Sequence, residues 1–74
     1  MKEEIEKLIR EYQQKISGKE AQLEELNQNI TRFRHTPNMS AKLMELRAER
    51  IMKEAQKQAY ITAQKDFESL LDLV

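Results

Sequence analysis

The fold depends on residues 5–33, IEKLIREYQQKISGKEAQLEELNQNITRF, in which seam positions recur in alternating steps of four and three. These positions are Ile5, Ile9, Tyr12, Ile16, Lys19, Leu23, Leu26, Ile30 and Phe33. This spacing is the heptad pattern of a helix that packs lengthwise against another helix. Lys19 is the only polar member, and it either extends its ammonium to solvent or sets the register of the seam.

The predicted first helix runs from about residue 2 to residue 34. Ser17 and Glu20 have the spacing of a capping box, and Gly18 could end a preceding helix. A real break would reset the heptad spacing, yet the spacing resumes in phase at Leu23. We therefore predict one continuous helix, in which Gly18 costs about 1 kcal/mol relative to Ala and leaves room for a mild kink.

A loop is indicated only by HTPNMS, residues 35–40. Pro37 disfavours helical angles at the residue before it, and Asn and Ser favour turns and caps. A second helix is predicted over about residues 41–73, with either Thr36 or Ser40 as its N-cap. Because the connection is short, the helices should be antiparallel neighbours. The sequence thus predicts an all-α fold, a single domain over residues 1–74 formed by a coiled-coil-like two-helix hairpin.

The second helix has a broad apolar face, which we predict to be its share of the helix-helix seam. Its members are Met44, Ala48, Ile51, Met52, Ala55, Ala59, Ala63, Phe67, Leu70 and Val74. The small side chains at positions 55, 59 and 63 would let another helix approach closely. A second group lies off this face or at the end of the helix, and we predict it to be a patch for a partner: Tyr60, Leu71, Leu73 and Val74.

The length of the chain, 74 residues without cysteine, predicts self-association. A single core of this size is marginal and usually needs disulfides, a metal or a partner subunit. Two-fold dimers are the commonest closed assembly, so we expect two hairpins to form a four-helix bundle. Residues 32–53 are rich in basic side chains, whereas residues 1–11 and 64–74 are mainly acidic. Two antiparallel rods would therefore bring opposite charges together.

No motif for catalysis, cofactor binding or metal binding is present, and the single His35 lacks the partners that such chemistry needs. We expect a non-enzymatic protein without cofactors. The alternative function is binding of an anion, RNA or DNA by the basic surface near the loop, formed by Arg32, Arg34, Lys42, Arg47 and Arg50. The N-terminal residues are too polar for a signal peptide, and no run approaches the roughly 20 apolar residues of a membrane span, so we expect a cytoplasmic location.

In architecture only, the chain resembles small helical hairpins that dimerise into four-helix bundles, such as the plasmid copy-control RNA-binding proteins, and the hairpin cochaperones of type III secretion. Its short length and its Lys, Glu, Gln, Ile and Asn usage resemble open reading frames of bacteriophages and mobile elements. These resemblances assign no residue a role. The expected function is that of a self-associating protein-interaction module with a protein partner: an inhibitor, an adaptor or an assembly factor.

Overall fold

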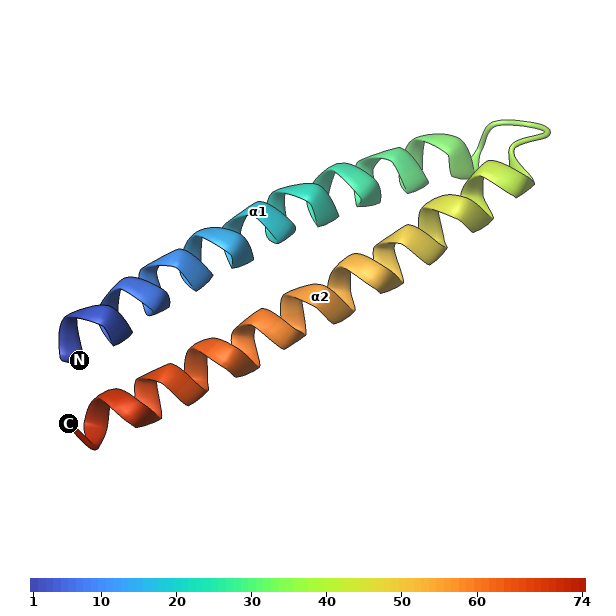
Figure 1. The fold of residues 1–74 in the computed structure, drawn as a ribbon. Coiled ribbons are helices and arrows are strands. Elements are labelled where there is room, and N and C mark those ends of the chain that lie inside the picture. Colours follow the sequence, from blue (N-terminus) through green and yellow to red (C-terminus); the bar gives the residue numbers. More distant parts are fainter.

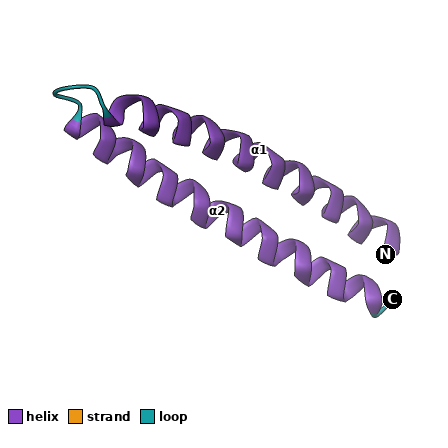
Figure 2. Cartoon of the chain, turned by 180° about the vertical axis from the view of Figure 1, so that it is seen from behind, coloured by secondary structure: helices purple, strands orange, loops and turns teal.

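The computed structural model describes all 74 residues as two α-helices joined by a short loop. Helix α1 spans Lys2–Arg34 and helix α2 spans Ser40–Asp72, with 33 residues in each. The helices run antiparallel, so both termini lie at one end of the molecule (Figure 1). The view from behind shows the single loop at the opposite end (Figure 2). The predicted all-α hairpin is confirmed.

The hairpin is a rod rather than a compact body. Its principal extents are 57 × 14 × 12 Å, and its radius of gyration is 16.8 Å. A compact chain of this length has a radius of gyration of about 11 Å. Only 4 of the 74 residues are buried, because each helix has a single neighbour. The free energy that holds the rod together therefore comes from one narrow seam.

Helix α1 continues through Gly18 without a break. A Cβ atom added at Gly18 would meet no atom within 4 Å, so the glycine is not required by a close approach of another element. Glu3 and Glu4 lie in the first turn, and Arg32 and Arg34 lie in the last turn. This distribution complements the macrodipole of the helix and stabilises both of its ends.

The loop reverses the chain within residues 35–39. Asn38 has a φ of 62°, in the left-handed region that Asn tolerates better than most residues. The Thr36 hydroxyl donates a hydrogen bond of 3.3 Å to the Arg32 carbonyl oxygen. Met39 is the N-cap of α2 and makes no side-chain cap bond. Our prediction of Thr36 or Ser40 as N-cap is wrong, since the reversal of direction occupies residues 36–38 and Ser40 is already helical.

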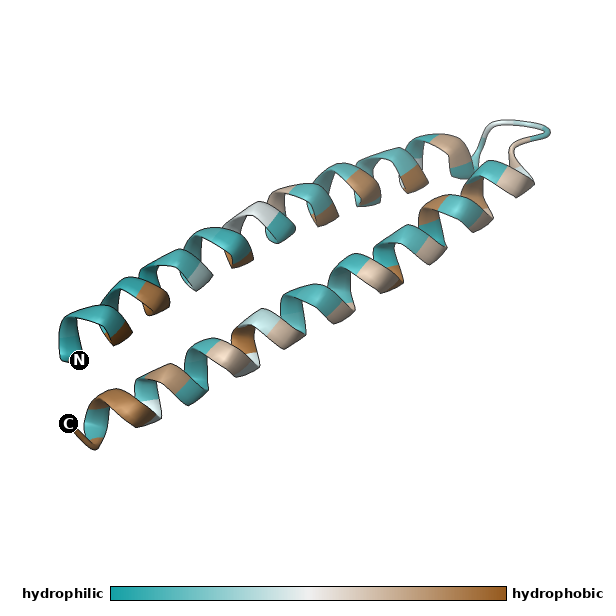
Figure 3. Ribbon diagram, in the orientation of Figure 1, coloured by the Kyte–Doolittle hydropathy of each residue, from teal (hydrophilic) through white to brown (hydrophobic).

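The side of α1 that faces α2 carries every position of the predicted heptad. Leu23, Leu26 and Ile30 are buried, and the other six positions are half-buried. Only Glu6 and Asn29 among the remaining residues of α1 are also partly covered. Figure 3 shows these apolar positions along the side of α1 turned toward α2.

Of the residues that we predicted for the seam of α2, only Phe67 belongs to the observed seam. Most covered positions again alternate in steps of three and four: Leu43, Leu46, Arg50, Lys53, Lys57, Tyr60, Gln64, Phe67 and Leu71. Outside this spacing, Ile61 and Ala63 are also partly covered. From the predicted apolar face only Ala63 and Phe67 are partly covered, whereas Met44, Ile51 and Met52 are 70, 69 and 58% exposed. For the hairpin, the predicted face of α2 is therefore wrong. The spacing that matches α1 places three cations in the seam, and their aliphatic stems supply the apolar contact.

Candidate functional site

Three polar contacts join the helices near their middle and define how residues are paired across the seam. They are a hydrogen bond of 2.6 Å from Lys19 Nζ to Gln56 Oε1, one of 3.2 Å from Arg50 Nη1 to Asn27 Oδ1, and an ion pair of 3.8 Å between Lys57 Nζ and Glu20 Oε1. The residue numbers of these pairs add up to 75, 77 and 77. Seam positions whose numbers add up to about 76 are therefore level with each other.

The loop-proximal part of the seam is apolar. By this register Ile30 is level with Leu46, and the two form a cluster with Leu26. Phe33 and Leu43 pack against the cluster from the side of the loop. Ile30 is the most deeply buried residue of the chain, with 2% of its surface exposed. This cluster is the only region that resembles a conventional hydrophobic core.

The middle of the seam is cationic. Lys53 is level with Leu23, and Lys57 is level with Lys19. Leu23 is nevertheless buried, because lysine stems can cover apolar surface while the ammonium groups reach solvent. Desolvation, and then the neighbouring Lys53, lower the pKa of Lys19 below its ordinary value. The cations are thus close enough to oppose each other's charge.

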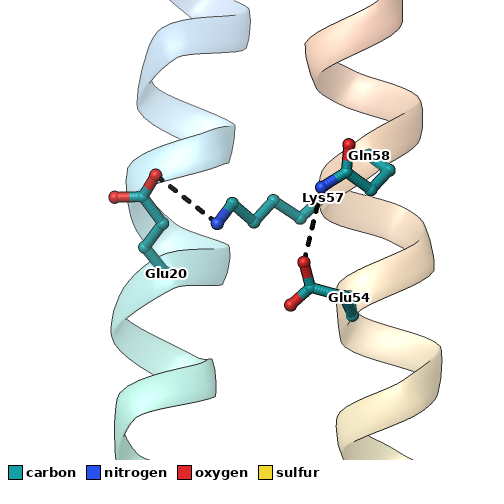
Figure 4. Close-up of polar contacts among 4 residues, drawn as sticks. All are labelled: Glu20, Glu54, Lys57 and Gln58. Carbon is teal, nitrogen blue, oxygen red and sulfur yellow. Dashed lines mark hydrogen bonds and ion pairs between the residues drawn. The ribbon is translucent and has the colours of Figure 1, made fainter.

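Two of these lysines have polar partners: Gln56 accepts the hydrogen bond from Lys19, and Glu20 forms an ion pair with Lys57 (Figure 4). The Lys57 side chain crosses from α2 to Glu20 on α1, and Gln58 donates a hydrogen bond of 3.4 Å to Glu54 within α2. The Lys57 side chain is 22% exposed, but the Glu20 side chain is 57% exposed. Exposed ion pairs contribute about 0 to 1 kcal/mol, so this contact orients the helices more than it stabilises them.

Aromatic side chains fill the seam toward the open end. The Tyr12 ring lies 5.7 Å from Tyr60 and 5.3 Å from Phe67, measured between ring centroids. Lys15 Nζ lies 4.7 Å from the centre of the Tyr12 ring. These contacts place Tyr60 inside the hairpin.

The predicted partner patch is divided by this arrangement. Tyr60 and Leu71 are half-buried on the side of α2 that faces α1, so they do not form a surface for a partner. Leu73 and Val74 are 81 and 60% exposed at the end of α2. Only these two C-terminal residues remain accessible.

The predicted apolar face of α2 is mostly a solvent-exposed band. We call it the outer stripe, and its exposed members are Met44, Ala48, Ile51, Met52, Ala55, Ala59, Leu70 and Val74. The exposed Leu73, from the predicted partner patch, extends the stripe beside Val74, and we include it. Figure 3 shows that apolar segments of α2 also occur on its side away from α1. The packing of these residues against a helix therefore stays a prediction, because no second helix of this chain covers them.

The five basic residues of the predicted anion surface surround the loop end of the rod. Arg32 and Arg34 are both exposed, but two positions correspond to about 200° around a helix, so they point to different sides. Arg50 is half-buried and bonded to Asn27, and Lys42 lies 4.0 Å from Glu45. Arg47 is exposed. The structure does not gather them on one surface, and nucleic-acid binding stays a prediction.

Three further features bear on function: a metal site, a small-molecule groove and a membrane-spanning helix. No group of three His, Cys, Asp or Glu residues could hold a metal ion. A groove beside the middle of the seam is lined by nine residues, and Leu23 is the only hydrophobic one among them. Small-molecule sites are usually lined mainly by apolar side chains, so this groove does not fit one. Neither helix has the combination of length and apolar character needed to cross a membrane.

Comparisons of the chain with protein families, with curated proteins and with solved structures found no match. The predicted seam of α2 does not include Arg50, Lys53 and Lys57, because cations do not continue an apolar pattern. The signal was present, since Leu43, Leu46, Tyr60, Phe67 and Leu71 already fall on one three-four spacing that mirrors that of α1.

Proposed function

We propose that this chain is a non-enzymatic protein-interaction module that self-associates, with two hairpins forming a four-helix, coiled-coil-like bundle. The observation that carries the proposal is the exposure of Met44, Ile51 and Met52 along one side of α2. Contiguous apolar bands on a small protein mark surfaces that bind other proteins. The roles that fit such a module are inhibitor, adaptor and assembly factor, each acting on a protein partner.

A second argument for self-association is the small core. Ordering a residue costs on the order of 1.5 kcal/mol, and one seam with 4 buried residues offers little apolar burial to offset this. A dimer would bury further apolar side chains without lengthening the chain. The lack of cysteine is compatible with the cytoplasm, which we propose as its location.

Light scattering coupled to size-exclusion chromatography tests the self-association. The expected molar mass is twice the 8.8 kDa of the chain, falling toward 8.8 kDa on dilution. A fully helical protein that keeps the monomer mass at every concentration would contradict the proposal.

Nucleic-acid binding is the function that a parallel assay distinguishes. Binding of RNA or DNA that weakens steeply with salt, and is lost on changing Arg32 and Arg34 to Gln, would favour that alternative. We expect no binding at low salt. A matched variant, Lys2→Gln with Lys7→Gln, removes two positive charges at the opposite end and serves as the control.

A further inference from the structure

The outer stripe lies opposite the seam. Ala48 and Ala55 each stand two positions from the nearest seam residues on both sides along the chain. Two positions correspond to about 200° around an α-helix, so these alanines are on the side turned away from α1. Helix α2 therefore has α1 on one side and the exposed stripe on the opposite side.

The surface area of the chain exceeds that of a compact protein of the same mass by about one partner's share of a standard interface. The hairpin exposes 5707 Å², whereas a compact protein of 8.8 kDa exposes about 4,800 Å². The excess, about 900 Å², is close to the roughly 800 Å² that each partner contributes to a standard interface. From Met44 to Leu73 the stripe is about 44 Å long, which one more helix of the length of α2 would cover.

The charges of α2 favour an antiparallel neighbour. Its first turn has no acidic residue and its last turn no basic residue. Lys42 lies near its N-terminus and Asp72 at its C-terminus, and both placements oppose the macrodipole of the helix. A second α2 in the opposite direction would bring the acidic end of one helix to the basic end of the other.

A self-complementary row of charges runs beside the stripe, about 100° around the helix from the mid-line of the stripe at Ala48 and Ala55. The row is Arg47, Glu54, Lys65 and Asp72, which lie within about 20° of one another around the helix axis. The spacing of seven, eleven and seven residues is symmetric, and the signs alternate. When the row is reversed, each charge meets its opposite: Arg47 meets Asp72, and Glu54 meets Lys65. A symmetric dimer needs this kind of surface, because the same patch must fit itself.

We propose that a second copy of this chain covers the outer stripe, with the two α2 helices antiparallel about a two-fold axis at Ala59. The inference rests on the proposed function and specifies its interface. The axis sets Ala59 against Ala59 of the second copy, Ala55 against its Ala63, and Ala48 against its Leu70. Small side chains at the centre allow close approach of the helices, and larger apolar side chains lie toward both ends. The two loops are then at opposite ends of the bundle.

Asp66 is a charged residue close to the mid-line of the stripe. In this arrangement it is level with Met52 of the second copy and loses part of its hydration without a cationic partner. A desolvated carboxylate without a partner weakens binding. We expect Asp66→Ala to tighten the dimer about tenfold, equivalent to about 1.4 kcal/mol. Asp66→Ala without tightening would contradict the position of Asp66 in the interface.

Cysteine crosslinking tests the axis, since the native chain has no cysteine. Oxidation, or a short bismaleimide, should join two Ala59→Cys chains at dimer-forming concentrations. Ala41→Cys is the matched control, because Ala41 is also an exposed alanine of α2 near the line of the stripe. In the antiparallel dimer the two copies of residue 41 are about 54 Å apart, so no crosslink is expected. Crosslinking at 41 without crosslinking at 59 would place the two loops side by side and overturn the proposal.

Charge reversal tests the pairing in the row of charges. Sedimentation equilibrium should show that Arg47→Asp and Asp72→Arg each weaken the dimer about tenfold or more, because each sets like charges against each other. The double variant should recover the native affinity within about threefold. In one chain these residues are about 37 Å apart along α2, so recovery must come from contact between copies. Arg10→Asp makes the same charge change on the exposed surface of α1 and should leave dimerisation unchanged.

These experiments distinguish the proposed self-association from the proposed arrangement of the two α2 helices. A dimer in which the double variant stays as weak as the single variants would overturn this arrangement and leave the proposed self-association standing. A native chain that stays monomeric at every concentration would overturn both. Circular dichroism on each variant checks that the helices are retained, so that loss of the dimer is not mistaken for unfolding.

Discussion

The loop-proximal third of the seam and the middle of the seam have the same spacing of residues, but the first is apolar and the second is cationic. Near the loop, Ile30, Leu26 and Leu46 form an apolar cluster. Around the middle, Lys53 is level with Leu23 and Lys57 is level with Lys19. Three of these four seam residues are therefore cations. The difference teaches that spacing determines which residues of two helices meet, whereas their chemistry determines how strongly they hold. We expect the cluster to provide most of the stability and the middle to reduce it.

The largest expected effect is at the cluster. Ile30→Ala removes the most buried side chain and should lower the free energy of unfolding by about 2 to 4 kcal/mol. Leu23→Ala in the middle should cost less, because flexible lysine stems can collapse into the space. Urea unfolding at one fixed protein concentration measures both. Gln13→Ala, at an exposed polar position of α1, is the control and should change stability by less than about 0.5 kcal/mol. Equal losses at Ile30 and Leu23 would break the comparison.

Lys53→Leu should strengthen the middle. A leucine at this position can pack against Leu23, and the change removes the cation beside Lys19. We expect a gain of about 1 to 2 kcal/mol from the added apolar contact. Lys53→Gln removes the charge without adding an apolar side chain and separates the two contributions. A loss of stability with Lys53→Leu would show that the cations are needed where they are.

Gly18→Ala tests whether the low helix propensity of glycine weakens helix α1 in the middle of the rod. The position is open, so an added methyl group meets no neighbour. Alanine favours the helical conformation over glycine by about 1 kcal/mol, and we expect a stabilisation of this size in thermal unfolding. Ser17→Ala, at the adjacent exposed position, should give about half of that or less. No gain from Gly18→Ala would indicate that the helix needs flexibility at this point.

The smallest effect expected is a dependence on pH. Because the pKa of Lys19 is lowered on folding, the unfolded chain binds more protons than the folded chain in the window just below the ordinary lysine value. Stability from this group therefore rises as pH increases through that window. Lys19→Gln should be more stable than the native chain at neutral pH, and the gap should narrow as pH rises. A gap that stays constant would show that Lys19 is not opposed by its surroundings.

The sequence was sufficient for α1 and insufficient for α2. One lysine among nine seam positions of α1 did not hide the spacing, since apolar residues on both sides kept it in phase. In α2 three successive cations and Gln64 interrupt the corresponding positions, while the outer stripe consists mainly of Ala, Met and Leu. Hydropathy treats lysine as wholly polar, although its four methylene groups can lie in a seam. The face with the better apolar pattern was thus mistaken for the face that packs inside the hairpin.

The common end of the two termini has a mechanical consequence. A force applied between Met1 and Val74 would pull the helices apart one layer at a time, like a zipper, instead of sliding them past each other. The aromatic layers at Tyr12 would resist first, the cationic layers at Lys19 would yield at lower load, and the cluster at Ile30 would resist again. A hairpin pulled from its ends should therefore pause with its loop-proximal third still closed. The apolar cluster near the loop would then be the last part of the seam to open.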